Sequence, residues 1–318
     1  MAENILTVEN LNIAYQGVPA VMDVNFTLER GKVLTIVGES GSGKTTVIRA
    51  LMGLLPVGGE VTDGTMIFNG HNLRTLSKSE WRSLRGKDMA MIFQDSGSAL
   101  DPIVRIGKQF RELFTSHIEI TNDECDRRAI ELLESVSLPN GADILRRYPH
   151  ELSGGQRQRV VIAMALTREP KLLIADEPTT ALDVTVQAEV VKLLNELREK
   201  LGFAMVFVSH DLALVAQLAH HITVMYAGQV VEMAPTSLLL ANPTHEYTRG
   251  LLGSVLSTEV RAKRLYQIPG SVPSPYDFAV GDRFASRSLR PDANPEQKLV
   301  LTAVEGEPSH LWASHLAK

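Results

Sequence analysis

The feature that most constrains this chain is a glycine-rich octapeptide, GESGSGKT, at residues 38–45. An apolar run at residues 33–37 comes directly before it and predicts a buried strand. Residues 45–55 predict a helix that ends before a proline and two glycines. The octapeptide matches G-x-x-x-x-G-K-[ST] completely, in the strand–loop–helix context in which that pattern holds phosphates. The sequence therefore predicts a nucleoside triphosphate site; the alternative is a glycine-rich turn with a surface lysine.

Each part of this loop has an expected chemical task. Glycines let backbone amides curl around phosphate oxygens, and the amino terminus of the following helix adds its dipole. We expect Lys44 to reach the β- and γ-phosphates and the Thr45 hydroxyl to ligate Mg²⁺. The expected nucleotide-binding residues are Gly38, Glu39, Ser40, Gly41, Ser42, Gly43, Lys44, Thr45 and Thr46.

A second apolar run, at residues 172–175, ends in two carboxylates, Asp176 and Glu177. Both can reach the mouth of a site at a strand end. Asp176 suits Mg²⁺, which prefers carboxylate and water ligands. Glu177 suits a general base that polarises an attacking water. The alternative, a solvated acidic loop, is less favoured beside a phosphate loop.

The rest of the chain alternates strand and helix patterns, which implies a largely parallel sheet with covered faces. Expected strands include residues 5–15, 21–28, 66–68, 89–93 and 204–208, with a helix at 186–201 and a hairpin at 222–233. We predict an α/β fold with a mixed, mainly parallel sheet, an antiparallel β subdomain and an inserted helical subdomain. The predicted boundaries are a nucleotide-binding domain at 1–255, its helical subdomain at about 95–168, and an extension at 256–318.

Composition excludes several classes of protein. The net charge of −5 and the 5% aromatic content argue against nucleic acid as a partner. A single cysteine, Cys125, rules out an intramolecular disulfide and a cysteine-built metal cluster. No apolar run approaches the roughly 18–20 residues that span a bilayer, and we expect no signal peptide. Any membrane role must therefore pass through a partner.

The run Leu152, Ser153, Gly154, Gly155 and Gln156 reads LSGGQ. With the phosphate loop before it and the acidic strand end after it, the chain resembles the ABC-type ATPases, of which LSGGQ is the signature. The glycine amides precede a helix, another anion-binding amino terminus. In that family this element binds the γ-phosphate of ATP held by the opposite subunit. The resemblance implies two ATPase subunits that enclose two MgATP head to tail.

Other residues match that family in order. Gln94 resembles the loop glutamine that contacts Mg²⁺ and water, and Asp183 resembles the loop that communicates between the two sites. His210 resembles the switch histidine that contacts the γ-phosphate. Tyr15 resembles the aromatic residue that stacks on adenine; the alternative is a core tyrosine. The resemblance thus makes Glu177, His210 and Gln94 catalytic, and Thr45, Gln94 and Asp176 ligands of Mg²⁺.

Several longer stretches are similar to the ATPases of oligopeptide, dipeptide and nickel importers: 91–95, 100–102, 148–152, 175–183, 242–252 and 268–274. Many of those relatives carry a cysteine cluster in the tail that holds an iron–sulfur centre. Here Asp282 and Ser288 stand where the first cysteines would fall, and Ser314 stands near the last. Such a cluster requires thiolates, so we predict none.

The resemblance implies an ATP-hydrolysing subunit of an importer at the cytoplasmic face of the inner membrane. Its expected partners are a second ATPase subunit, identical or homologous, two membrane permease subunits and, indirectly, an extracytoplasmic solute-binding protein. Peptides are the favoured solute, with nickel, glycosides and opines open. The alternatives are the ATPase of an exporter or a non-transport ABC ATPase. The spacing leaves no room for the insertions of DNA-repair ABC proteins, and translation-associated ones carry two ATPase domains in tandem.

Overall fold

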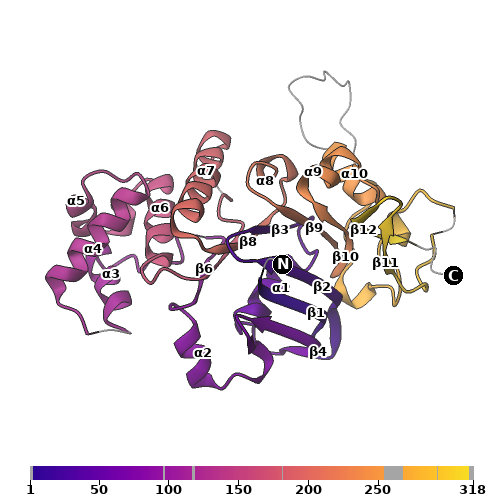
Figure 1. The fold of residues 1–318 in the computed structure, drawn as a ribbon, viewed down its shortest axis with the longest axis horizontal. Helices are drawn as coiled ribbons and strands as arrows, with labels where there is room; N and C mark the ends of the chain where they lie inside the picture. Colours follow the sequence, from indigo (N-terminus) through magenta and orange to yellow (C-terminus); the bar gives the residue numbers. More distant parts are fainter. Residues whose placement is uncertain are drawn as a thin grey trace. The chain divides into compact units, whose positions relative to one another are not determined.

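A computed structural model describes residues 3–95, 97–116, 119–180, 182–253, 268–291 and 293–314. The chain divides into two compact units, one made of Met1–Leu76 with Val206–Lys318 and the other of Ser77–Met205. Figure 1 shows the elements of both. The domain boundary that we predicted near residue 256 lies outside the described residues.

The first unit begins with a four-stranded antiparallel sheet in the order β2-β1-β4-β5. Apolar residues alternate along β1 and place one face against the core, with Leu6 and Leu11 fully buried. Register shifts along β1 mark bulges that increase the local twist. This sheet is the antiparallel part of the predicted fold; its strands are β1 (Asn4–Tyr15), β2 (Val18–Glu29), β4 (Gly59–Phe68) and β5 (His71–Asn72).

A second sheet of this unit carries the phosphate loop. All five residues of β3 (Val33–Val37) are buried, as the continuous apolar run predicts, and β3 pairs in parallel with β9 (His221–Tyr226). β8 (Ala204–Ser209) stands beside β3 in the strand order, and β10 (Gln229–Pro235) forms the predicted hairpin with β9. Helix α1 (Lys44–Leu51) ends earlier than we predicted. The reason is Gly53, whose φ of +59° terminates the helix.

The C-terminal part of the chain extends this same sheet. β12 (Glu307–Ser314) pairs with β10 through Glu232 and Met233, and β11 (Val300–Val304) pairs with β12. The fully buried Glu232 carboxylate accepts a hydrogen bond from the backbone N–H of His245 at 3.0 Å and pairs with His310 at 2.6 Å. The remaining elements of this part are α8 (Leu212–Val215), α9 (Thr236–Ala241), α10 (Glu246–Gly253), η3 (Pro275–Asp277) and η4 (Ala285–Arg287).

The second unit combines a parallel strand pair with helices. β6 (Met89–Ile92) pairs with β7 (Leu172–Asp176), and α7 (Val184–Leu201) follows β7. Phe110, Phe114 and Cys125 are buried between helices, and burial raises the pKa of the Cys125 thiol. The predicted helical stretch contains α3 (Ile106–Thr115), α4 (Asn122–Ser135), α5 (Gly141–Arg146), η2 (Pro149–Glu151) and α6 (Gly154–Ala165), and α2 (Lys78–Leu84) precedes β6.

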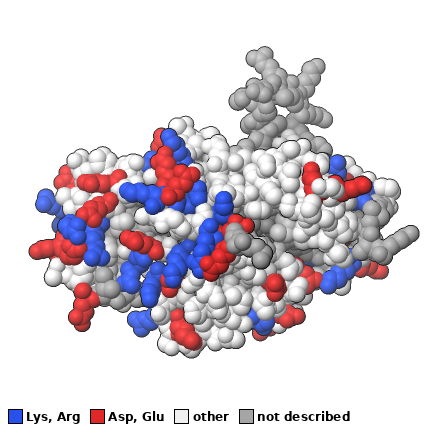
Figure 2. All heavy atoms as spheres, viewed as in Figure 1, with Lys and Arg blue, Asp and Glu red and all other residues white. Residues whose placement is uncertain are grey.

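Surface charge in this unit is mixed in sign. Figure 2 shows Lys and Arg interspersed with Asp and Glu over the helices at the left of the view. On α4, Arg127 pairs with Glu124 and Glu131 at helical spacing. None of the helices in the described ranges combines the length and the apolar character that a bilayer span requires.

Candidate functional site

The phosphate loop connects β3 to α1 and depends on glycine where the backbone is crowded. A Cβ atom at Gly38 would lie 2.2 Å from the carbonyl oxygen of Met225, a distance that no side chain can adopt. Gly43, with φ of +93°, precedes α1 and lies close to the backbone of Gly228. The loop is therefore packed tightly against the β9–β10 turn before it reaches the helix.

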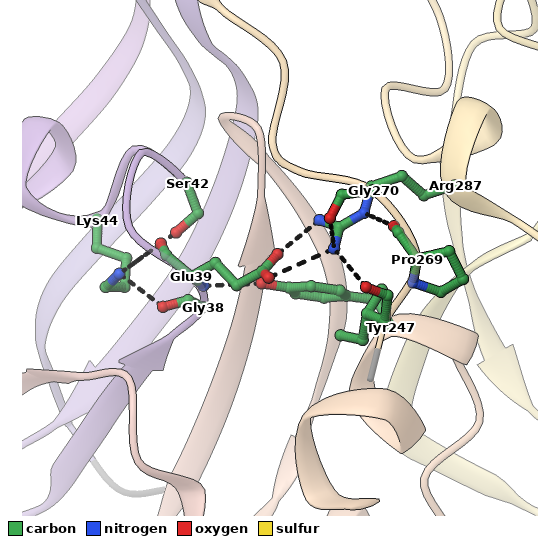
Figure 3. A network of polar contacts seen from close by, with 9 residues as sticks. Gly38, Glu39, Ser42, Lys44, Tyr247, Pro269, Gly270 and Arg287 are labelled. Carbon is green, nitrogen blue, oxygen red and sulfur yellow. Dashed lines mark hydrogen bonds and ion pairs between the residues drawn. The ribbon is translucent and has the colours of Figure 1, made fainter. Parts of the chain in front are cut away.

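The Lys44 side chain lies inside the curl of this loop. Its ammonium donates hydrogen bonds to the carbonyl oxygens of Gly38 at 2.7 Å and Glu39 at 2.9 Å, and the side chain is buried (Figure 3). These bonds offset the free-energy cost of removing the ammonium charge from water. The positive charge is thereby held at the centre of the loop.

The other loop residues divide by exposure. Ser40 and Gly41 are exposed, Ser42 is buried, and Thr45 and Thr46 are half-buried in the first turn of α1, where backbone N–H groups favour an anion.

Tyr15, the residue expected to stack on adenine, ends β1 and is half-buried. Its ring lies so close to Gly59 that a Cβ there would be 2.6 Å from a ring carbon.

The second unit brings Gln94 and Glu177 together. The amide nitrogen of Gln94 donates to the Glu177 carboxylate at 3.2 Å, and the Thr180 hydroxyl donates to the same oxygen at 3.0 Å. Glu177 adopts a left-handed φ of +44°, uncommon for a residue with a side chain and typical of functional sites. Asp176, directly before it, is buried at the end of β7.

Ser153 and Gln156 form a capping box at the start of α6. The Ser153 hydroxyl accepts from the Gln156 N–H at 3.2 Å, and the Gln156 side chain accepts from the Ser153 N–H at 3.0 Å. A Cβ at Gly154 or Gly155 would be in van der Waals contact with side chains that flank the start of α7. Asp183 caps that helix by accepting from the Val186 N–H at 3.0 Å. The signature run and Asp183 are thus neighbours in this unit.

His210 belongs to the first unit, with the phosphate loop and Tyr15. It follows β8 and is exposed. The next residue, Asp211, fixes the local backbone, because its carboxylate accepts from the Leu214 N–H at 3.0 Å and its own N–H donates to Ser209. The unit of residues 77–205 carries Gln94, Asp176, Glu177, Asp183 and the signature run.

The three positions at which the resemblance led us to look for cysteines carry oxygen-bearing side chains, which take part in hydrogen bonds. The Asp282 carboxylate accepts from the Phe284 N–H at 2.8 Å, and Ser288 bonds to the Glu246 carboxylate. The hydroxyl of Ser314 bonds to that of Thr302 at 2.8 Å. These residues supply no thiolate, so they do not fit an iron–sulfur cluster.

Sequence reasoning missed three residues that support the phosphate loop: Tyr247, Arg283 and Arg287. Arg287 forms an ion pair with Glu39 at 2.7 Å, and the Tyr247 hydroxyl accepts from the Glu39 N–H at 2.7 Å. The sequence carries no signal for them, because they lie about 200 or more positions from the loop and contact it only through the fold.

Two families match this chain. The ABC transporter family matches residues 21–180, and the family of oligopeptide/dipeptide transporter C-terminal regions matches residues 231–294. The chain is 44% identical over 291 residues to the dipeptide transport ATP-binding protein DppD of Lactococcus lactis subsp. cremoris (strain MG1363), covering 90% of this chain and 83% of that protein. It is also 44% identical over 290 residues to the oligopeptide transport ATP-binding protein OppD of Bacillus subtilis (strain 168), covering 89% and 81%.

A solved structure agrees with these matches. It is the ATP-binding cassette MJ0796, described as dimeric, in a post-hydrolysis state and bound to ADP and Pi. The two chains superpose with a TM-score of 0.65 at 26% identity, over 73% of this chain and 98% of that one. The α/β fold class that we predicted is thereby confirmed. The chain belongs to the ABC transporter family of ATPases, with a C-terminal region of the oligopeptide/dipeptide transporter type.

Proposed function

We propose that this protein is the ATP-hydrolysing subunit of an ABC importer that takes up peptides through separate permease subunits. One observation carries the proposal. A complete phosphate loop, an acidic strand end and a capped LSGGQ helix occur on the same chain as a peptide-transporter C-terminal region. The relatives at 44% identity are transport ATP-binding proteins for dipeptides and oligopeptides, which supports peptides as the solute class.

Each site residue has a task in this proposal. Lys44 and the backbone amides of the loop hold the phosphates. Glu177 takes the proton of the attacking water, and Gln94 and Thr180 orient its carboxylate. His210 contacts the γ-phosphate, and Tyr15 stacks on the base. Catalysis of this kind is largely positioning and charge stabilisation.

The donor types fit Mg²⁺. Thr45 supplies a hydroxyl, Asp176 a carboxylate and Gln94 an amide oxygen, and hard cations of this size take oxygen ligands. The Gln94 amide nitrogen donates to Glu177, so its oxygen is the atom offered to a cation. Bound Mg²⁺ would neutralise the charge on the β- and γ-phosphates.

The protein acts with partners. The signature helix binds the γ-phosphate of ATP held by a second ATPase subunit, identical or homologous, so one chain supplies half of each site. The dimeric form of the similar cassette supports this arrangement. The helical subdomain binds the permease at the cytoplasmic face of the inner membrane. A solute-binding protein delivers the peptide to the permease.

Reconstitution tests the proposal. A permease pair that copurifies with this protein is placed in nanodiscs with its ATPase subunits, and ATP hydrolysis is measured with a solute-binding protein, with and without peptide. We expect peptide-loaded binding protein to stimulate hydrolysis. Stimulation by nickel or glycosides alone would redirect the solute class, and failure of the chain to copurify with any permease would exclude the importer role.

A further inference from the structure

An arginine from the C-terminal region reaches the phosphate loop. The Arg287 guanidinium donates to the Glu39 carboxylate at 2.7 Å and 3.4 Å, although the two residues lie 248 positions apart in the chain. The Arg287 side chain is 4% exposed and that of Glu39 is 34% exposed. Figure 3 shows Glu39 between Lys44 and Arg287. Salt screens a partly shielded ion pair of this kind less than it screens a surface pair.

The Arg287 side chain is fixed in a socket. Its nitrogens donate to three successive carbonyl oxygens, those of Ile268 at 3.3 Å, Pro269 at 2.6 Å and Gly270 at 3.3 Å. The guanidinium also lies over the ring of Tyr226, 5.4 Å from its centroid. These contacts fix the position of the guanidinium, and none of them involves Glu39.

The same region touches the loop at further points. The Tyr247 hydroxyl accepts from the Glu39 N–H, and the Tyr247 ring packs edge-on against Tyr226. A methyl group of Val272 lies 4.0 Å from the place that a Cβ at Gly41 would occupy. Both the backbone and the side chain of Glu39 are therefore held by residues beyond position 226.

Arg283 provides a second support, through the β9–β10 turn. It donates to the carbonyl oxygens of Ala227 at 2.6 Å and Ala20 at 3.3 Å, and its guanidinium lies over the Phe278 ring. The next residue of the turn, Gly228, donates its N–H to the carbonyl oxygen of Ser42 at 2.9 Å. Burial lowers the pKa of Arg283 to about 10, so it stays charged at neutral pH.

Charge gives these contacts a functional meaning. A carboxylate in a phosphate loop repels the nucleotide, and the repulsion is strong where water is excluded. The Arg287 guanidinium compensates that charge on the side of Glu39 opposite Lys44. Lys44 and the loop amides are then left to interact with phosphate.

We propose that Arg287 is a positioning residue of the nucleotide site, which neutralises and orients Glu39 so that the phosphate loop accepts nucleotide. The C-terminal region thereby completes the site, in addition to any role in solute transport. The proposal rests on the proposed function only in that residues 38–45 bind nucleotide phosphates.

The test is a double-mutant cycle on the full chain, with the Kd for MgADP measured by calorimetry. We expect Arg287→Gln to weaken binding about tenfold when Glu39 is present and less than about twofold in a Glu39→Gln background. The reason is that the Glu39→Gln substitution removes the charge that Arg287 compensates. Arg287→Lys keeps the charge but loses the planar fork of donors, so its Kd should lie between those of the wild type and Arg287→Gln.

Matched controls separate the possible outcomes. Arg30→Ala removes the exposed Arg30–Glu3 pair of the same unit, 2.9 Å long, and should leave the Kd unchanged. Lys44→Ala should abolish binding; if it does not, the assignment of the phosphate loop fails, independently of Arg287. Equal losses from Arg287→Gln in both backgrounds would overturn the proposal and leave Arg287 a packing residue. If Arg287→Gln does not fold, the same cycle is run with Arg287→Lys, and equal losses with Glu39 and with Glu39→Gln would overturn the proposal.

Discussion

At the scale of single residues, the site depends on side chains held in unusual surroundings. Glu177 has a left-handed backbone and a carboxylate shared by Gln94 and Thr180, and Lys44 is buried within its own loop. Gly38 occupies a place where no larger residue fits. Substitutions at Glu177 and Gly38 therefore test the chemistry and the shape of the site separately.

Glu177→Gln should leave MgATP binding intact and reduce the rate of hydrolysis by about a hundredfold or more, because the amide cannot take the proton of the attacking water. Steady-state phosphate release and nucleotide binding by the same preparation provide the measurement. Glu169→Gln, an exposed carboxylate of the same unit, is the control and should hydrolyse ATP at the wild-type rate. Near-normal turnover by Glu177→Gln would remove Glu177 from its role.

Gly38→Ala should abolish nucleotide binding, because the added Cβ would lie 2.2 Å from the Met225 carbonyl oxygen and would force the loop to move. Gly70→Ala is the matched control. Gly70 has φ of +82° with open space around its Cβ position, so the substitution should cost about 1 kcal/mol of stability and spare binding. Calorimetric titration with MgADP and a thermal melt of each variant separate the two effects. Tight binding by Gly38→Ala would show that the loop tolerates the displacement.

At the scale of elements, helix starts carry both stability and function. α2 and α6 each begin with a capping box, formed by Ser77 with Glu80 and by Ser153 with Gln156. The two boxes are alike in chemistry and belong to the same unit. Their comparison therefore isolates what the signature helix does beyond its own stability.

Ser77→Ala and Ser153→Ala should each destabilise the protein by about 1 kcal/mol, the usual effect of removing a hydroxyl cap. Only Ser153→Ala should also lower the rate of ATP hydrolysis, because its hydroxyl and the neighbouring amides are expected to contact the γ-phosphate bound by the partner. Urea denaturation reports the stability and phosphate release reports the activity. Equal hydrolysis by both variants would contradict the proposed role of the signature.

At the scale of the whole molecule, the proposed function requires two chains for each site. The specific ATPase activity of the isolated protein should therefore rise with protein concentration as subunits associate, since assembly follows mass action. A dilution series over about a hundredfold in concentration, with sedimentation at each point, provides the measurement. Constant specific activity from a monomer throughout the series would exclude a composite site. Where the native partner is a homologue, the same series is run with that subunit added.

Short-range patterns predicted much of this protein. The buried strand β3, the β9–β10 hairpin and helix α7 could each be read from apolar periodicity and turn residues, because these patterns are local in sequence. The loop at 38–45 and the LSGGQ run could be read for the same reason, since each is a single strand–loop–helix or loop–helix step. The end of α1 was misjudged, because the left-handed Gly53 stops the helix before the apolar pattern does.

The sequence by itself determined the family, the phosphate loop and the types of residue available for chemistry, because these are written in contiguous motifs. Only the tertiary structure decided what surrounds Glu39. The Arg287 guanidinium contacts the Glu39 carboxylate, which lies 248 positions away in the chain. It reaches that place because β12 pairs with β10 and because residues 268–287 pack around Tyr226 and Tyr247. A single sequence encodes no signal for such a contact, since ion pairing depends on distance in space and not on spacing along the chain.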